Sequence, residues 1–461
     1  MRLTVIGCGY LGAVHAAAMA DLGHHVLGVE TDPARLERLA RGEAPFYEPG
    51  LDELLHRGAR TGRLRYTAEL DGAAARADVH FLAVGTPQSP SGRGADLSHL
   101  WRAVDSLAEA LPRCVHPDGL PLVVGKSTVP VGTAQQVADR LAGRALVVWN
   151  PEFLREGMAV ADTLSPDRIV YGLPDEPARA ERARTVLDEV YAPILEAGAP
   201  RLTMGYQTAE LVKTAANAFL ATKISFINAM SALCAATGAD VTVLADAIGR
   251  DARIGPHFLR AGLGFGGGCL PKDLRGLEQR AAELGANGLA SFLGRVDSIN
   301  RGQRDRVTQM ALEALGPDAA GRAVTILGIT FKPDSDDLRD SPVLEVALRL
   351  ADAGAVVTVH DPRGLAGLRR LHPVLRTQPD ALRALEGAEL VILGTEWKEL
   401  TDLDPEAAAA RVARPVLIDA RNALTPSRWT AAGWDYRGIG RPSGPRRSAP
   451  RHRALAGTMV G

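Results

Sequence analysis

Short apolar runs alternate with alanine-rich or amphipathic stretches through the first part of the chain. The apolar runs cover residues 3–6, 25–29, 79–84, 121–124 and 145–148, and each is too short for a typical helix. Helical patterns lie between them, for example over residues 14–22. Short buried strands that alternate with helices are typical of a doubly wound, mostly parallel α/β sheet. We predict a Rossmann-like domain over residues 1–205.

The last part of the chain repeats this order of apolar runs. Residues 323–328, 354–361 and 388–394 resemble, in turn, residues 3–7, 23–30 and 77–85. A polar insertion, residues 331–342, follows the first of these runs, at the carboxyl edge where open α/β sheets bind ligands. We predict a second Rossmann-like domain over residues 311–440, without the glycine fingerprint of the first.

A long helical pattern without glycine or proline connects the two parts, over residues 208–237. At 1.5 Å per residue it would be ~45 Å long, which suits a central helix that joins two domains. Such helices often pack against a symmetry mate, so we expect a homodimer or a larger homo-oligomer. We assign residues 206–310 to a central helical dimerisation domain. Residues 441–461 are rich in arginine and proline without any acidic residue, and we expect a disordered basic tail.

Length, composition and charge narrow the class of protein. A chain of 461 residues exceeds one compact core, and 46% apolar with 23% charged residues is ordinary for a soluble enzyme. A net charge of −1 gives no reason to expect nucleic-acid binding. No apolar run approaches the ~18 to 20 residues that span a bilayer, so no membrane span is expected. The four cysteines have no metal-binding spacing and no signal peptide precedes the first strand, so we expect a cytoplasmic protein with reduced thiols and no metal.

A dinucleotide fingerprint lies near the amino terminus. Gly7, Gly9 and Gly12 stand between a strand and a helix, and Glu30 ends the next strand. Glycines in this place admit a pyrophosphate to the helix N-terminus, and the carboxylate accepts the ribose hydroxyls. A carboxylate repels a 2′-phosphate, so NAD is predicted over NADP. Arg35 is the residue that would suit NADP, and its alternative is a surface position on the following helix.

Three more motifs end strands of the same predicted sheet. Gly85-Thr-Pro-Gln88 lines the cofactor or forms a simple turn. Lys126-Ser-Thr-Val-Pro130 places hydroxyls at the carboxyl edge or caps the next helix. In Asn150-Pro-Glu-Phe-Leu-Arg-Glu156, a helical conformation would put both glutamates on one face, either for acid–base work or as a solvated helix start.

Two later segments add a pair of donors and a thiol. Lys213 and Asn217 lie four residues apart among apolar neighbours; they suit an oxyanion site, and the alternative is two side chains that reach for solvent. Cys269 follows a run of glycines, with Pro271 in the first turn of the next helix, so the helix N-terminus favours a thiolate. Asp273 is placed to share the pocket of Cys269. On this segment alone, a nucleophile and a small buried thiol fit equally well.

Taken in combination, these residues indicate the oxidation of an alcohol to an acid. A simple alcohol dehydrogenase needs hydride transfer and one base, whereas a thiol also traps the aldehyde as a thiohemiacetal that loses a second hydride. The resulting thioester needs water and a carboxylate for hydrolysis. The set therefore predicts a four-electron oxidation that uses two NAD.

The chain resembles the UDP-glucose/GDP-mannose dehydrogenase family of nucleotide-sugar 6-dehydrogenases from residue 1 to about residue 440. The motifs that carry the resemblance are those quoted above together with Tyr47-Glu-Pro-Gly-Leu51, Ala209-Glu-Leu-Val-Lys-Thr-Ala-Ala-Asn-Ala-Phe219, Gly264-Phe-Gly-Gly-Gly-Cys-Leu-Pro-Lys-Asp273 and Phe331-Lys332. The resemblance implies conversion of UDP-glucose to UDP-glucuronate, in nucleotide-sugar metabolism and polysaccharide biosynthesis. GDP-mannose and UDP-N-acetylamino sugars are the nearest alternatives. A two-electron hydroxy-acid dehydrogenase would not need Cys269, and a non-catalytic sensor would show a damaged residue set.

The resemblance also implies roles for individual residues. Cys269 would be the nucleophile, with Lys213 or a water held by Asp273 as the base and Glu152 assisting hydrolysis. The catalytic set is Cys269, Lys213, Asn217, Asp273, Glu152 and Thr128. The cofactor-binding set is Gly7, Gly9, Tyr10, Leu11, Gly12, Glu30, Arg35, Gly85, Thr86, Thr128, Glu156 and Lys272. The substrate-binding set is Glu152, Phe153, Leu154, Lys213, Asn217, Arg253 (reaching across from a partner subunit), Arg260, Phe265, Gly266, Phe331, Lys332 and Arg421.

The chain departs from the common family pattern at three positions. Gly268 stands where the family often has serine, and Glu30 where aspartate is common. Both changes are mild, because glycine bends freely and glutamate keeps the charge. Ala420 replaces a glycine before Arg421, which weakens the assignment of Arg421 to the substrate.

Overall fold

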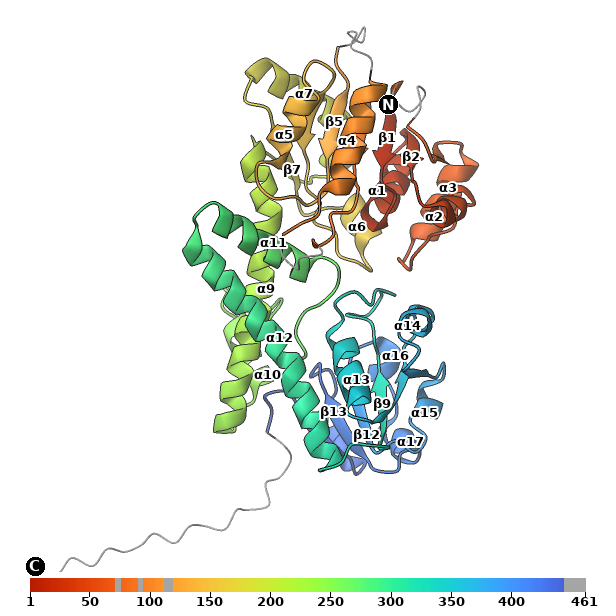
Figure 1. Ribbon diagram of the computed structural model, residues 1–461, viewed down its shortest axis with the longest axis vertical. Helices are drawn as coiled ribbons and strands as arrows, with labels where there is room; N and C mark the ends of the chain where they lie inside the picture. Colours follow the sequence, from red (N-terminus) through yellow and green to blue (C-terminus); the bar gives the residue numbers. More distant parts are fainter. Residues whose placement is uncertain (71–75, 90–93, 112–118, 443–461) are drawn as a thin grey trace, which may run out of the picture.

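Two α/β domains and a helical middle part make up the molecule, in a computed structural model that describes residues 1–70, 76–89, 94–111 and 119–442. Figure 1 places the two sheets one above the other, with α9 and α12 running beside them. The predicted basic tail falls almost wholly outside the described residues, and so does Cys114. The predicted fold class, two Rossmann-like domains joined by a long central helix, is confirmed.

The first domain is built on an eight-stranded sheet of order β3-β2-β1-β4-β5-β6-β7-β8. Its strands are β1 Arg2–Ile6, β2 His25–Val29, β3 Leu64–Thr67, β4 Val79–Leu82, β5 Leu122–Gly125, β6 Leu146–Trp149, β7 Ile169–Leu173 and β8 Arg201–Gly205. All neighbours are parallel except β6 and β7, which meet through Trp149 and Gly172. Central β1 pairs Leu3 with Val26 on one side and with Val79 on the other.

Helices cover both faces of this sheet. They are α1 Tyr10–Asp21, α2 Pro33–Ala40, α3 Leu51–Arg60, α4 Ser98–Ala110, α5 Thr133–Arg140, α6 Ala159–Leu164, α7 Pro177–Val190 and α8 Ala192–Glu196. The buried residues of α1, α3 and α7 form one core, and those of α4 and α5 form the other. Helix α1 begins four residues before the predicted residue 14, because the glycine turn leads directly into it.

The second domain has a six-stranded parallel sheet of order β11-β10-β9-β12-β13-β14. Its strands are β9 Ala323–Leu327, β10 Val356–His360, β11 Arg376–Thr377, β12 Leu390–Leu393, β13 Val416–Asp419 and β14 Asp435–Gly438. Its helices are α13 Pro342–Asp352, α14 Leu365–Leu371, α15 Ala381–Ala384, α16 Lys398–Thr401, α17 Pro405–Ala409 and α18 Pro426–Ala431. The polar insertion follows β9 and reaches the first domain, as described below.

The middle part contains α9 Tyr206–Thr237, α10 Val241–Gly249, α11 Leu270–Glu283 and α12 Asn287–Leu315. Helix α9 packs on the first sheet through Ala209 and ends at Gly238, whose φ of +76° stops the helix. The carboxyl half of α12 packs on the second sheet through Val307 and Ala311. The middle part therefore connects the two domains, with α9 packed on the first sheet and α12 on the second.

Helix α9 corrects the expectation that no stretch is long and apolar enough to cross a membrane. By length and composition alone α9 meets that requirement, and 39% of its most apolar window is buried inside the chain. Core helices of soluble proteins meet the same requirement. The expectation was based on uninterrupted apolar runs, and Glu210, Lys213 and Lys223 interrupt the run in α9.

Candidate active site

The glycine turn between β1 and α1 has the shape that a dinucleotide needs. Gly7 has a φ of +87°, and a Cβ on Gly12 would lie 1.9 Å from the carbonyl oxygen of Gly7. A Cβ on Gly9, by contrast, would meet nothing within 4 Å. Gly7 and Gly12 therefore allow the tight turn, and Gly9 leaves room for a pyrophosphate at the N-terminus of α1.

Glu30, at the end of β2, is buried and fits the ribose of such a cofactor. Its carboxylate accepts hydrogen bonds from the Asp32 backbone N–H at 2.9 Å and from Nη1 of Arg35 at 3.0 Å. Arg35 is therefore held by Glu30 through an ion pair. The pair supports the prediction of NAD, because the carboxylate stays at the position where NADP carries its phosphate.

Tyr10, inside the fingerprint, connects the cofactor turn to the segment that carries the two predicted glutamates. Its hydroxyl donates to the Glu48 carboxylate, which also accepts the backbone N–H groups of Gly157 and Ala159, both at 2.7 Å. Glu48 thus caps the start of α6. In the sequence Glu48 is only one position of a motif. Its hydrogen-bond partners lie about 110 residues away, so the spacing gives no signal of this contact.

Thr86 and Lys272, two residues of the predicted cofactor-binding set, lie close together. The Thr86 hydroxyl donates to the Thr128 carbonyl at 2.7 Å, which joins the ends of β4 and β5. Lys272 forms an ion pair with Asp273 at 2.7 Å and lies 3.5 Å from the Thr86 hydroxyl. A small hollow lined by Thr128, Lys272 and Asp273 opens beside them.

The segment after β6 is not helical, which corrects the conditional prediction of two glutamates on one helical face. Residues 151–155 form an irregular loop, and α6 begins only at Ala159. Glu152 turns toward α9, whereas Glu156 turns toward the second domain. The backbone N–H of Leu154 donates to the Glu152 carboxylate at 2.5 Å instead of to a helical carbonyl.

Lys213 and Asn217 each hold a different carboxylate. Lys213 Nζ lies 3.0 Å from Oε1 of Glu152, and Asn217 Nδ2 donates to Asp273 at 2.7 Å. The sequence predicted that both donors point at one oxygen site. In the structure each of them is instead paired with its own carboxylate. Burial lowers the pKa of Lys213, but the charges of Glu152 and Asp273 and the nearby Cys269 outweigh it, and the pKa is raised. Lys213 is an ammonium at neutral pH and acts as a donor.

Cys269 is the N-cap residue of α11, with Pro271 in the first turn as predicted. Its side chain is exposed to solvent but surrounded by protein groups. The loss of hydration and the negative charges of Glu152 and Asp273 raise the pKa of Cys269 to about 12, against a smaller lowering by Lys213. The pKa of Cys269 is thus raised, whereas the sequence predicted a thiolate favoured by the helix N-terminus.

The glycine run before Cys269 is pressed against two other parts of the molecule. Asn300, on α12, accepts from the Phe265 N–H at 2.8 Å and donates to its carbonyl at 3.0 Å. A Cβ on Gly266 would lie 2.2 Å from the carbonyl oxygen of Asp340. Phe265 is buried by these contacts. Gly268 leaves space for the guanidinium of Arg339, which would lie within 2.7 Å of a Cβ at that position.

The polar insertion after β9 reaches the first domain through Glu156. Lys332 Nζ donates to the Glu156 carbonyl, and the Ser335 hydroxyl donates to its carboxylate at 3.2 Å. Burial, followed by the charge of Asp337, raises the pKa of Glu156 to about 7, while Arg339 and Lys332 act in the opposite direction. Phe331 lies on the same loop. The loop therefore closes over the segment that carries Glu152.

The three predicted arginines of the substrate set lie in different surroundings. Arg421 is enclosed, and it donates to the carbonyls of Gly394, Gly264 and Phe331 at 2.6, 3.0 and 3.0 Å. Arg260 is exposed and lies 3.6 Å from Glu396. Arg253 points into solvent and pairs with Asp251 at 2.7 Å. Arg421 thus fastens the second domain to the glycine run, whichever other groups it contacts.

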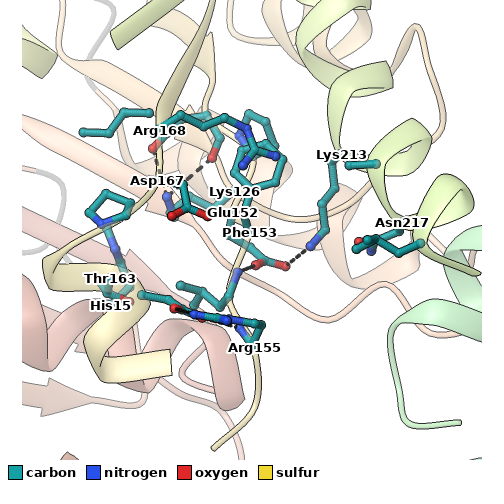
Figure 2. Close-up of a pocket in the computed structure, with 18 of the residues that line it drawn as sticks. His15, Lys126, Glu152, Phe153, Arg155, Thr163, Asp167, Arg168, Lys213 and Asn217 are labelled. Carbon is teal, nitrogen blue, oxygen red and sulfur yellow. Dashed lines mark hydrogen bonds and ion pairs between the residues drawn. The ribbon is translucent and has the colours of Figure 1, made fainter. Parts of the chain in front are cut away.

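A cavity of about 620 Å³ opens beside the two carboxylate pairs. Figure 2 shows Glu152 extended toward Lys213, with Asn217 on the same helix, and His15 and Thr163 on the other side of Glu152. Five predicted substrate residues line the cavity, namely Glu152, Phe153, Leu154, Lys213 and Asn217. The other members of that set do not line it. Among the described residues, no cluster of histidine, cysteine and acidic side chains forms a metal site.

The sequence was compared with known proteins. It matches the UDP-glucose/GDP-mannose dehydrogenase family in its NAD binding domain over residues 1–195, in its central domain over residues 207–302 and in its UDP binding domain over residues 325–426. UDP-glucose 6-dehydrogenase of Rhizobium meliloti is 40% identical, over 96% of this chain and 100% of the relative. The enzyme of that name from Pseudomonas aeruginosa is 41% identical, over 96% and 98%.

Solved structures give the same picture. A UDP-glucose dehydrogenase from Pyrobaculum islandicum is similar with a TM-score of 0.85 and 39% identity, covering 95% of this chain and 98% of that one. UDP-D-ManNAc dehydrogenase from Pyrococcus horikoshii has a TM-score of 0.81 at 25% identity, covering 96% and 100%. The likeness thus extends over nearly the whole chain.

Proposed function

The chain belongs to the UDP-glucose/GDP-mannose dehydrogenase family of NAD-dependent oxidoreductases, and we propose that it oxidises UDP-glucose to UDP-glucuronate through covalent intermediates on Cys269. The observation that carries the proposal is the arrangement around that thiol. Lys213 on α9, Glu152 in the loop after β6 and Asp273 on α11 act on Cys269, and Asn217 on α9 holds Asp273. A two-electron alcohol oxidation has no use for this arrangement.

The residues divide the reaction into two oxidations and a hydrolysis. Bound NAD supplies the hydride acceptor, once for the alcohol and once, after exchange, for the thiohemiacetal. Asp273 holds the water that takes the alcohol proton, since Lys213 is already protonated. Cys269 adds through sulfur to the aldehyde carbon, and the thiol proton ends on the aldehyde oxygen as the hydroxyl of the thiohemiacetal. Lys213 and Asn217 donate to that oxygen with the N–H groups that their carboxylate partners leave free. Glu152 then accepts a proton from the water that attacks the thioester.

The remaining site residues are assigned to the two ligands. NAD is held by the fingerprint (Gly7, Gly9, Tyr10, Leu11 and Gly12), by Glu30 and Arg35, and by Gly85, Thr86, Thr128, Glu156 and Lys272. The sugar nucleotide is held by Glu152, Phe153, Leu154, Lys213, Asn217, Arg260, Phe265, Gly266, Phe331, Lys332 and Arg421. In this assignment, residues 1–205, 206–310 and 311–440 form the cofactor, central and nucleotide-sugar domains.

UDP-glucose is preferred over the alternative nucleotide sugars because of the relatives. The proteins named UDP-glucose 6-dehydrogenase are 40% and 41% identical, whereas the UDP-D-ManNAc dehydrogenase is 25% identical. We place the enzyme in the cytoplasm, where nucleotide sugars are made for polysaccharide biosynthesis.

A homodimer completes the proposed site. Phe219, Phe226 and Leu233 repeat every seven residues on α9, and their exposed fractions are 67%, 52% and 55%. A solvent-exposed stripe of this kind on a central helix is typical of an interface. Arg253 points away from its own site, so in the dimer it would reach the partner's nucleotide sugar.

The test is the stoichiometry of the reaction. The wild-type protein is incubated with NAD and, separately, UDP-glucose, GDP-mannose and UDP-N-acetylglucosamine, and NADH is counted per sugar consumed. We expect two NADH per UDP-glucose and a carboxylate product, and a Cys269→Ala variant should lose turnover by at least about a thousandfold. One NADH per sugar, or full activity of Cys269→Ala, would contradict the proposal.

A further inference from the structure

The cavity beside Glu152 continues behind it into the first domain. Its inner end is lined by His15 on α1, Lys126 after β5, Asn150 after β6 and Tyr191 before α8. None of these residues has a role in the reaction described so far. Glu152 therefore lies between the Lys213 side of the cavity and this inner end in the first domain (Figure 2).

Lys126 is the group that requires an explanation. It is buried, and no carboxylate within the described residues lies within 4 Å of its ammonium group. Its partners are neutral: Asn150 Oδ1 at 2.9 Å, the Asn150 carbonyl at 3.4 Å and the Tyr191 hydroxyl at 3.5 Å. A buried ammonium without a counter-ion is costly, and burial lowers its pKa to about 8, with a smaller opposing effect of Glu152. Packing alone therefore does not account for a lysine at this position.

Asn150 transmits the position of Lys126 to Glu152. Its Oδ1 also accepts from the Tyr191 hydroxyl at 2.7 Å, and its Nδ2 donates to the carbonyl of Val170 on β7 at 2.9 Å. The amide is thus fixed on three sides. Because Glu152 follows only two residues later, with Pro151 restricting the backbone between them, the direction in which Glu152 leaves β6 depends on this amide.

The inner end of the cavity has the chemistry of a water site. His15 is nearly fully buried, and its Nε2 has no protein partner although the ring lines the cavity. A buried polar nitrogen is normally hydrogen-bonded, and water supplies the bond where a cavity offers several polar groups. The ammonium of Lys126, the hydroxyl of Tyr191 and the imidazole of His15 are three such groups within one space.

We propose that this inner space stores and delivers the water that hydrolyses the Cys269 thioester, with Lys126 as the positioning residue. Lys126 binds water at the inner end of the cavity. Through Asn150 it also sets the direction in which Glu152 points toward the thioester. In the step itself, the water oxygen bonds to the thioester carbon and the carbon–sulfur bond breaks. One water proton passes through Glu152 to the leaving sulfur, and the other stays on the new acid group and dissociates. No further oxidant or reductant is needed.

The inference rests on the proposed function, and it predicts a defect confined to one half-reaction. In a Lys126→Met variant, the two hydride transfers proceed within about twofold of the wild-type rate, whereas hydrolysis slows at least about tenfold. Rapid mixing with UDP-glucose should then give a burst of two NADH per site, followed by slow turnover. Mass spectrometry of the acid-quenched protein should find the acyl adduct on Cys269. Hydroxylamine, which attacks the thioester without Glu152, should restore turnover and give a hydroxamate.

Two matched variants complete the experiment. Tyr191→Phe removes only the hydroxyl that contacts Lys126 and Asn150, so it should give a smaller defect of the same kind and serves if Lys126→Met does not fold. Lys398→Met removes an exposed lysine on α16 and should leave both phases unchanged. Two results for Lys126→Met would overturn the inference. One is an equal slowing of the burst and of turnover, and the other is wild-type kinetics without an acyl adduct on Cys269. Failure of wild-type protein to form two NADH would instead contradict the proposed function.

Discussion

At the scale of single residues, the charge state of Cys269 decides when it reacts. A helix N-terminus lowers the pKa of a thiol, but it acts weakly beside two full negative charges. Burial, followed by the negative charges of Glu152 and Asp273, raises the pKa of Cys269, and the positive charge of Lys213 opposes them. The same carboxylates that are needed for proton transfer therefore keep the resting thiol protonated, which also protects it from oxidation.

The first prediction concerns the alkylation of Cys269 in the protein without ligands. Because only the thiolate reacts, a pKa of about 12 means that the iodoacetamide rate rises about tenfold per pH unit from pH 7 to 10 without levelling. Glutathione, measured in parallel, should level near pH 9. The rate is followed by intact-protein mass, with Cys269→Ser as the control.

Two substitutions separate the charges that act on Cys269. Glu152→Gln removes a negative neighbour and should speed alkylation at pH 8, whereas Lys213→Met removes the positive one and should slow it. A plateau below pH 8 in the wild-type protein would restore the idea of a thiolate prepared by the helix N-terminus.

At the scale of elements, the turn between β1 and α1 separates two uses of glycine. Gly12 is needed by the fold, since its missing Cβ allows contact with the carbonyl of Gly7. Gly9 faces open space, so a side chain there affects only a ligand. The same distinction is invisible in the sequence, where both are simply positions of one motif.

The second prediction follows from this difference. Gly12→Ala should lower the free energy of unfolding by about 3 kcal/mol, because the new methyl group overlaps backbone that cannot move. Gly9→Ala should change stability by less than about 0.5 kcal/mol but weaken NAD binding at least about tenfold. Urea unfolding and calorimetric titration with NAD measure the two effects. Equal stability losses in both variants would be evidence against this assignment.

At the scale of the whole molecule, the site exists only where three parts meet. The insertion after β9 closes on Glu156, Arg421 fastens the second domain to the glycine run, and α9 carries Lys213 and Asn217 between them. The side chain of Arg253 points outward, so one chain supplies an incomplete set of predicted residues. The homodimer that we propose would supply Arg253 to the site of the partner subunit.

The third prediction is that the apolar stripe of α9 forms the dimer. Phe226→Glu places a charge in the stripe and should weaken self-association at least about a hundredfold, measured by sedimentation velocity. Activity should fall with the loss of dimer. Val374→Glu alters a more exposed residue in the second domain, 68% against 52% for Phe226, and should change neither self-association nor activity. An active monomeric Phe226→Glu protein would remove the dimer from the proposed site.

The sequence by itself determined the fold class and most of the chemistry. Alternating apolar runs require buried parallel strands, the long run without glycine or proline requires a helix, and glycines with Glu30 indicate NAD, because each of these signals is local. Only the tertiary structure decided which groups meet. Glu152 pairs with Lys213, Glu156 with the insertion loop, and Glu48 with the start of α6, across 61, 179 and 111 residues in turn. The pKa of Cys269 and the space behind Glu152 depend on such long-range neighbours, which no local pattern encodes.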